Sequence, residues 1–317
     1  SNASVFVFKS SPGYQVPDEW STIPPTWLPR GEMVAVAGRG EFFVRRHVHP
    51  DPDAPTVLLL HGWTASSDLQ FLAAYRALAE VCSFVGLDHR GHGRGFRSLQ
   101  PFTLEDVADD AAGVVRELGL ASVIALGYSM GGPIALHLTR RHRDLVGGVI
   151  VQATALEWSA TLRERLSWRL LPLMGVAMRS RFQPFGLRKA VDNLIGARSE
   201  LAQHRDWLVA ETLRNDPRAV VEAGRALSRY DATTWAGELG VPAAMLISTK
   251  DRLVNPRKQR QLASVLNAMV VEVAMDHLGA LEMPDEFASA TVQLVESVAA
   301  ALPSAAAGSS RSANASN

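Results

Sequence analysis

The hexapeptide Gly127-Tyr128-Ser129-Met130-Gly131-Gly132 gives the clearest indication of how this chain folds. It follows an apolar run, residues 123–126, that is typical of a buried strand, and it precedes a helical pattern at residues 133–138. A serine with glycines two residues before and after it fits a sharp strand-to-helix elbow, because a Cβ at either glycine would collide with neighbouring backbone. The turn raises the hydroxyl above the sheet and places the next N–H at a helix start. Ser129 is therefore a candidate nucleophile; the alternative is a loop serine between two turn glycines.

The composition narrows the class of protein. The chain has 317 residues, of which 47% are hydrophobic, and this suits one large α/β domain or a domain with an insertion. A formal net charge of zero without a basic stripe argues against a nucleic-acid partner. The lone cysteine, Cys82, excludes an internal disulfide and is expected to be a small buried hydrophobe.

The sequence contains no run of eighteen apolar residues and no evident signal peptide. We therefore expect no membrane span and a cytoplasmic location. Ser1-Asn2-Ala3 is typical of an expression-tag remnant, so a natural N-terminal signal could have been removed. The oligomeric state is left open.

Short apolar segments alternate with helical ones along most of the chain. The expected strands are 33–37, 41–47, 56–60, 83–87, 122–126, 146–151, 243–248 and 270–274. The expected helices are 66–80, 103–118, 256–266 and 284–302. Because fully apolar strands alternate with helices, the sequence predicts an α/β fold with a mostly parallel sheet and helices on both faces.

Residues 156–235 interrupt this alternation. They show no strand pattern, hold several helical stretches, and carry thirteen Lys and Arg against nine Asp and Glu. We interpret them as a helical insertion. The expected division is an extended N-terminal segment with the tag remnant (1–32), a core (33–155 and 236–303), a helical cap (156–235) and a disordered tail (304–317).

A serine nucleophile needs a base and an acid that orients the base. His277 lies in the loop after the last expected strand, and Asp251 follows the strand 243–248. Both loops leave the carboxyl edge of the parallel sheet, as the elbow does, so these side chains are expected to meet. Asp276 is the rival acid, but neighbouring side chains usually point apart, so it would orient the ring of His277 poorly. The alternatives are an exposed loop histidine and a surface aspartate paired with a neighbouring base.

The oxyanion formed during acyl transfer needs two N–H donors. Met130 supplies one after the elbow, and Trp63, directly after the strand 56–60, is the candidate for the other. Gly62 permits a close approach of the backbone to the substrate, and His61 is expected to fix this loop through hydrogen bonds rather than to act as the base. The alternative is a simple strand-ending turn.

These motifs together resemble the α/β-hydrolase superfamily over residues 33 to 302, as a capped serine esterase or lipase. The matching pieces are His61-Gly62-Trp63, Leu87 to Gly93, the elbow with Gly127 and Gly131, Asp251 and His277. The resemblance implies that Asp88 to Gly93 is a structural turn beside the active site, although two histidines beside an aspartate also suggest a metal site. We expect neither a metal nor a cofactor.

The expected function is hydrolysis of a small carboxylic ester through an acyl-enzyme formed on Ser129. The apolar stretch at residues 166–178 favours an apolar acyl ester; it is expected to pack within the cap or, alternatively, to touch a lipid surface. Two other reactions stay open: cleavage of a carbon–carbon bond, for which Leu278 replaces the tryptophan common in such relatives, and perhydrolysis. A small-molecule receptor built on a hydrolase scaffold is the alternative from a different class.

Overall fold

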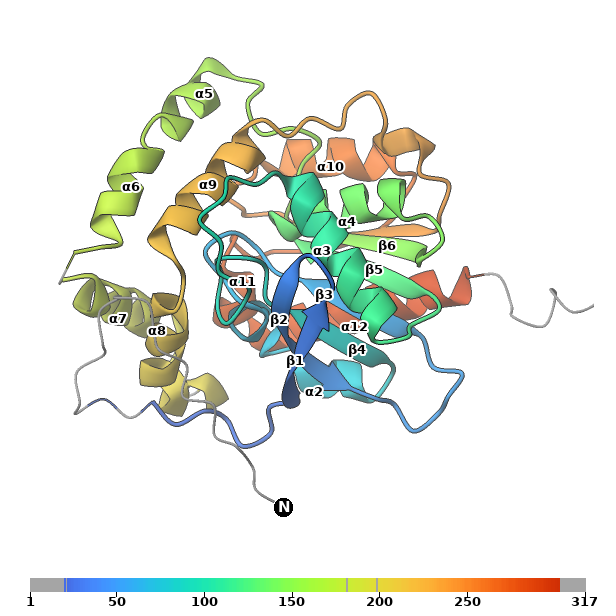
Figure 1. Cartoon of the computed structure of the whole chain (residues 1–317), viewed down its shortest axis with the longest axis horizontal. Coiled ribbons are helices and arrows are strands. Elements are labelled where there is room, and N and C mark those ends of the chain that lie inside the picture. The colour runs from blue at the N-terminus through green and yellow to red at the C-terminus, as the bar shows by residue number, and fades with distance from the viewer. Residues whose placement is uncertain (1–19, 21, 181, 198, 303–317) are drawn as a thin grey trace, which may run out of the picture.

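The computed structural model describes residues 20, 22–180, 182–197 and 199–302, so the tag remnant, most of the N-terminal segment and the tail 304–317 lie outside the described residues. Within these ranges one sheet has the strand order β1-β2-β4-β3-β5-β6-β7-β8 (Figure 1). Its strands are β1 (Arg30–Val36), β2 (Gly40–His47), β3 (Thr56–Leu60), β4 (Ser83–Leu87), β5 (Val123–Tyr128), β6 (Val146–Gln152), β7 (Ala243–Ser248) and β8 (Met269–Val273). Strands β3 to β8 pair in parallel, and only the β1–β2 and β2–β4 pairs are antiparallel. The predicted mostly parallel α/β sheet is confirmed.

Helices cover both faces of the sheet, because alternate side chains of each strand point to opposite sides. Along β5, Val123 and Ala125 enter one core and Ile124 and Leu126 the other. The first core is closed by α3 (Leu104–Glu117), α4 (Gly131–Arg141) and α10 (Pro256–Val265), and the second by α1 (Ser67–Phe71), α2 (Tyr75–Ala79) and α12 (Pro284–Ala300). A short helix, α11 (Gly279–Glu282), precedes α12.

Two expected elements differ from the structure. Residues 66–80 form two short helices, α1 and α2, instead of one. Leu72, between them, packs in a cluster with side chains of the region between β6 and β7, whereas Phe71 and Tyr75 pack against the sheet, and the turn allows both sets to be buried. Strand β1 begins at Arg30, inside the segment expected to be extended, because Arg30 pairs with Arg46 of the hairpin partner.

The region between β6 and β7 is helical. It contains α5 (Leu162–Trp168), α6 (Leu171–Ala177), α7 (Gln183–Leu194), the 3₁₀ turn η1 (Glu200–His204), α8 (Arg205–Leu213) and α9 (Pro217–Ser228), and the turn η2 (Ala236–Glu238) leads into β7. These helices lie together at one side of the sheet, on the left of Figure 1. The described residues between β6 and β7 form no strand, only an isolated β-bridge between Glu157 and Asp231. The division into a core and a cap stays a prediction.

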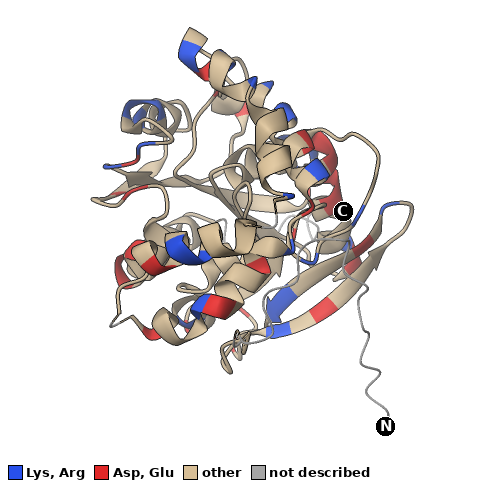
Figure 2. Cartoon of the chain, turned by 90° about the vertical axis from the view of Figure 1, so that its left-hand side faces the viewer, with Lys and Arg blue, Asp and Glu red and all other residues tan. Residues whose placement is uncertain are grey.

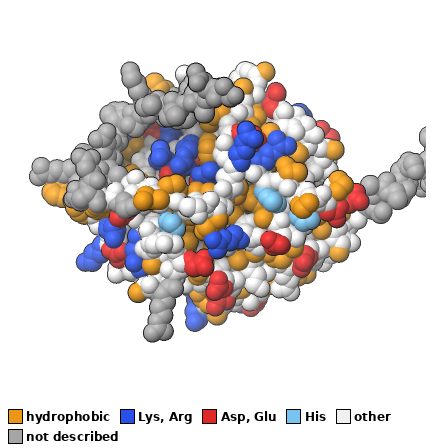
Figure 3. Space-filling view, turned by 90° about the horizontal axis from the view of Figure 1, so that it is seen from below, with side chains coloured by type: hydrophobic (Ala, Val, Ile, Leu, Met, Phe, Trp, Pro, Cys, Tyr) orange, Lys and Arg blue, Asp and Glu red, His pale blue; other side chains and the backbone are white. Residues whose placement is uncertain are grey.

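Positively and negatively charged residues are mixed over the faces of the molecule shown in Figures 2 and 3. Basic and acidic residues both occur across the face seen in Figure 2, and the face seen from below mixes basic, acidic and hydrophobic side chains (Figure 3). Among the described helices, none is both long and apolar enough to cross a bilayer. Cys82 is fully buried, as expected, and burial raises the pKa of its thiol to about 12.

Candidate active site

Ser129 occupies a strained turn between β5 and α4. Its φ is +51°, in the left-handed region that non-glycine residues rarely adopt. A Cβ on Gly127 would lie 2.0 Å from the carbonyl oxygen of Gly131, and a Cβ on Gly131 would lie 1.9 Å from the carbonyl oxygen of Leu60. Both contacts are with backbone, which cannot rotate away as a side chain does. The structure therefore gives a steric reason for the two glycines that flank the serine.

The structure brings Ser129, His277 and Asp251 into one chain of hydrogen bonds. His277 Nε2 lies 3.0 Å from Ser129 Oγ, and His277 Nδ1 lies 2.8 Å from Asp251 Oδ2. Because an ionised carboxylate only accepts, the ring proton resides on Nδ1, which leaves Nε2 free to accept the proton of the serine hydroxyl. The Tyr128 hydroxyl donates to the His277 carbonyl at 2.8 Å and ties the histidine loop to β5.

Asp251 is buried and fully hydrogen-bonded. Its Oδ1 accepts from the N–H groups of Leu253 and Val254, both at 2.8 Å, and its Oδ2 accepts from Gln259 Nε2 at 3.0 Å besides the His277 ring. The surface-pair alternative for Asp251 is therefore wrong, since its side chain is 0% exposed.

The rival acid, Asp276, is turned away from the imidazole. Its carboxylate accepts from the backbone N–H groups of Arg252 and His277 and pairs with the Arg252 side chain at 2.9 Å. Burial opposes ionisation of Asp276, but these donors and the Arg252 charge outweigh it and lower its pKa. Asp276 thus shapes the loop around His277 without contacting its ring.

The loop after β3 lies against the elbow. A Cβ on Gly62 would be 3.3 Å from Ser129 Cβ, so only glycine allows this approach without displacement. The Gly62 carbonyl accepts from His61 Nδ1 at 2.7 Å and from Ala65 N–H at 3.3 Å. Since C=O and N–H of one trans peptide point in opposite directions, these bonds orient the Trp63 N–H away from them. In the described part of the chain, the Trp63 and Met130 amides have no acceptor.

Three histidines form a buried, neutral cluster behind this loop. His61 Nε2 accepts from the His89 N–H at 3.0 Å, which fixes the ring proton of His61 on Nδ1. Burial lowers the pKa of His61 well below its usual value, and lowers that of His89 to about 3 and that of His92 to about 4. Burial and then the charge of Asp68 raise the pKa of Asp88 to about 7. Among the described residues, no three His, Cys, Asp or Glu side chains converge as metal ligands.

Two glutamines near the site were missed by the sequence reasoning. Gln259 is fully buried in α10 and holds Asp251, but its position on a polar helix gives no sign of this contact. Gln70 is 8% exposed, its Oε1 lies 3.1 Å from a Cβ built on Gly62, and its carboxamide makes no hydrogen bond with the described residues. Only the tertiary packing reveals either.

The helices between β6 and β7 reach the site through Trp63. Its indole Nε1 donates to the Val220 carbonyl of α9 at 2.8 Å, and its ring lies 5.7 Å from that of Trp168. Of the apolar stretch at 166–178, Leu171 is buried, whereas four side chains are largely exposed: Leu166, Leu170, Leu173 and Val176. The expectation that this stretch simply packs inside the cap is therefore wrong for these four.

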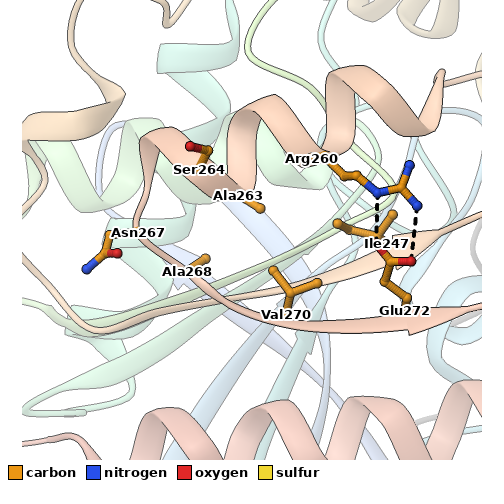
Figure 4. Close-up of a pocket in the computed structure, with 8 residues that line it drawn as sticks. All are labelled: Ile247, Arg260, Ala263, Ser264, Asn267, Ala268, Val270 and Glu272. Carbon is orange, nitrogen blue, oxygen red and sulfur yellow. Dashed lines mark hydrogen bonds and ion pairs between the residues drawn. The ribbon is translucent and has the colours of Figure 1, made fainter.

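A separate hollow of about 380 Å³ lies between α10 and the edge strand β8. Figure 4 shows the Arg260–Glu272 ion pair, at 2.8 Å, along its wall, with Ile247 and Val270 as apolar lining. None of the residues that line it belongs to the Ser129 site.

Comparison with known proteins identifies the family. Residues 55–284 match the model of the alpha/beta hydrolase fold family, and the chain belongs to this family and is a hydrolase. It is 28% identical to a pimeloyl-[acyl-carrier protein] methyl ester esterase of Neisseria meningitidis, over 78% of this chain and 96% of that protein. It is 34% identical to a bifunctional esterase/perhydrolase of Acinetobacter calcoaceticus, but over only 31% of this chain and 36% of that one. An esterase structure from Exiguobacterium antarcticum shares the fold with a TM-score of 0.71 at 19% identity, covering 84% of this chain and 100% of that one.

Proposed function

We propose that this hydrolase cleaves carboxylic esters through an acyl-enzyme formed on Ser129. The observation that carries the proposal is the continuous hydrogen-bond chain from Ser129 through His277 to Asp251. A serine hydroxyl alone is a weak nucleophile, and this arrangement supplies both a base within reach of its proton and an anion that orients the base.

In this mechanism Ser129 Oγ attacks the ester carbonyl carbon while its proton passes to His277 Nε2. Asp251 stabilises the imidazolium. The N–H groups of Trp63 and Met130 donate to the oxyanion, each contributing about 3 kcal/mol of transition-state stabilisation. When the tetrahedral intermediate collapses, the bond to the alcohol oxygen breaks and His277 returns the proton to the leaving alcohol. A water molecule, deprotonated by His277, then attacks the acyl carbon and releases the acid and Ser129.

The proposed substrates carry an apolar acyl chain. Trp168 and Leu171 bring apolar surface from the proposed cap to Trp63, whose loop supplies one of the two proposed oxyanion donors. The relatives named as esterases support an ester, and the Neisseria protein is named for a methyl ester on an acyl chain. The exposed side chains at 166–176 would also suit contact with a lipid surface, which co-sedimentation with lipid vesicles would detect.

A labelling experiment tests the mechanism together with the substrate class. We expect a fluorophosphonate to label the protein rapidly, Ser129→Ala to abolish labelling, and activity on nitrophenyl esters to rise from acetyl to longer acyl chains. Ester turnover that survives Ser129→Ala would overturn the proposal, and a decline with chain length would overturn the apolar-acyl assignment. A protein that is never labelled would instead favour the receptor alternative.

The same acyl-enzyme can react with hydrogen peroxide instead of water. The Acinetobacter relative is named for both activities, which favours perhydrolysis as a second candidate. Peracid formation from a short ester in the presence of peroxide, lost in Ser129→Ala, would support it. If peroxide yields only the acid, water is the acceptor.

A further inference from the structure

Asn215 joins the helical region between β6 and β7 to the loop beside Ser129. It lies between α8 and α9 and is 4% exposed. Its Nδ2 donates to the Thr64 carbonyl at 2.7 Å, and its Oδ1 accepts from the Gly93 N–H at 2.9 Å. Because both ends of the carboxamide are used, only one orientation of this side chain satisfies both loops.

Thr64 needs such a contact, since its backbone is strained. Its φ is +62°, in the left-handed region, which a β-branched residue rarely adopts. Within the loop, the Ala65 N–H to Gly62 carbonyl bond closes the turn at a long 3.3 Å. The shorter bond from Asn215 holds the Thr64 peptide from outside the loop. Without it, relaxation of Thr64 toward negative φ would rotate the chain that carries the Trp63 amide.

We propose that Asn215 is a positioning residue that keeps the Trp63 N–H aimed at the developing oxyanion, and that it thereby links the helical insertion to the chemical step. This inference rests on the function proposed above. Asn215 does not touch the reacting atoms; it acts through Thr64 and the turn that follows Trp63.

The junction has other anchors that do not involve Thr64. The Asp216 N–H donates to the Gly91 carbonyl at 2.9 Å, and Arg97 Nη2 donates to the Arg214 carbonyl at 2.6 Å. A variant at Asn215 should therefore leave α8 and α9 in place. Arg97 also offers a matched control. Its Nη2 donates to the Gly93 carbonyl as well as to the Arg214 carbonyl, so its removal loosens the same junction while both the donor on Asn215 and the acceptor on Thr64 remain in place.

The test compares Asn215→Asp with Arg97→Met. Aspartate keeps the acceptor for the Gly93 N–H but replaces the donor to Thr64 by an oxygen that faces the carbonyl. For a short nitrophenyl ester we expect Asn215→Asp to lower kcat by about 10- to 100-fold with KM nearly unchanged, since a donor poorly aimed at the oxyanion acts on the transition state rather than on substrate binding. Affinity for a trifluoromethyl ketone, which forms the oxyanion adduct, should fall in parallel. Arg97→Met should retain kcat within about threefold.

Equal losses of kcat in the two variants would overturn the proposal, because they would indicate general loosening of the junction. A rise in KM with unchanged kcat would also overturn it. Peptide-resolved amide hydrogen exchange over residues 61–66 tests the positioning role without relying on the proposed function. Exchange should be faster in Asn215→Asp than in the wild type or in Arg97→Met. This result is expected whether or not the wild type is labelled by a fluorophosphonate. No difference in exchange would show that Asn215 does not hold the loop.

Discussion

Replacing Asp251 by asparagine exchanges one oxygen for an amide nitrogen, and the surrounding contacts determine which one. The N–H groups of Leu253 and Val254 both donate to Oδ1, at 2.8 Å, so the carbonyl oxygen of the asparagine is held there. The new Nδ2 then takes the place of Oδ2, facing His277 Nδ1 and the donor nitrogen of Gln259. Gln259 cannot simply turn over, because its Oε1 accepts from the Ser248 N–H.

The size of the effect follows from the proton on the imidazole. An NH₂ group beside Nδ1 favours the tautomer with the proton on Nε2, and that nitrogen can no longer accept the proton of Ser129. We expect kcat to fall by about 10⁴-fold, which corresponds to about 5 kcal/mol of activation free energy. KM should change little, because Asp251 is 5% exposed and lies behind the histidine.

Stopped-flow acylation with a nitrophenyl ester and the rate of fluorophosphonate labelling measure this loss directly, and circular dichroism checks that the variant is folded. Asp276→Asn is the matched control: it removes the rival carboxylate and an ion pair whose arginine is 88% exposed, so the effect should be within about threefold. The reasoning is refuted if Asp251→Asn keeps more than about a tenth of wild-type kcat, or if Asp276→Asn loses more than Asp251→Asn.

Three further outcomes follow from the packing and the charges. Gly131→Ala places a Cβ 1.9 Å from a backbone oxygen of β3, so kcat should fall by about 100-fold and the unfolding free energy by about 1–3 kcal/mol. The control is Gly186→Ala, whose Cβ meets nothing within 4 Å and which should keep the wild-type kcat and unfolding free energy. Equal losses in the two variants would contradict the argument that the elbow requires glycine at 131. Arg94→Met removes the bidentate partner of the buried Glu211, which keeps its bond from Arg214 Nε at 2.9 Å, and should cost about 1.5–3 kcal/mol in urea unfolding, whereas a loss below about 1 kcal/mol would mean that the pair is effectively solvated. Burial in the folded protein lowers the pKa of His92 from about 6.5 to about 4, so the unfolded chain binds more protons between these values and stability falls as pH drops through this window, by up to about 1.4 kcal/mol per pH unit. His92→Asn should flatten that part of the stability curve, and an unchanged slope would show that this ring does not titrate there.

Local features of this fold could be predicted from the order of its residues. The glycines around Ser129 were recognised from their spacing. For Gly127 the colliding atom is the nearby Gly131 carbonyl oxygen, whereas for Gly131 it is the Leu60 carbonyl oxygen, which only the docking of the elbow on β3 brings close. Strand and helix order followed from apolar periodicity, because burial on two faces leaves that pattern in any chain. The pairing of Asp251 with His277 was expected from the shared carboxyl edge of parallel strands, which is a property of the topology.

Contacts between side chains that no local rule connects became visible only in the folded chain. Gln259 holding Asp251, and Asn215 holding Thr64 across 151 residues, depend on how helices dock on the sheet, and a polar residue on a helix has the same sequence signature whether it docks or faces water. The break between α1 and α2 has the same origin, since Leu72 is buried by helices that follow it by more than a hundred residues. Periodicity records which residues are buried, but the partner that buries them is set by packing in three dimensions.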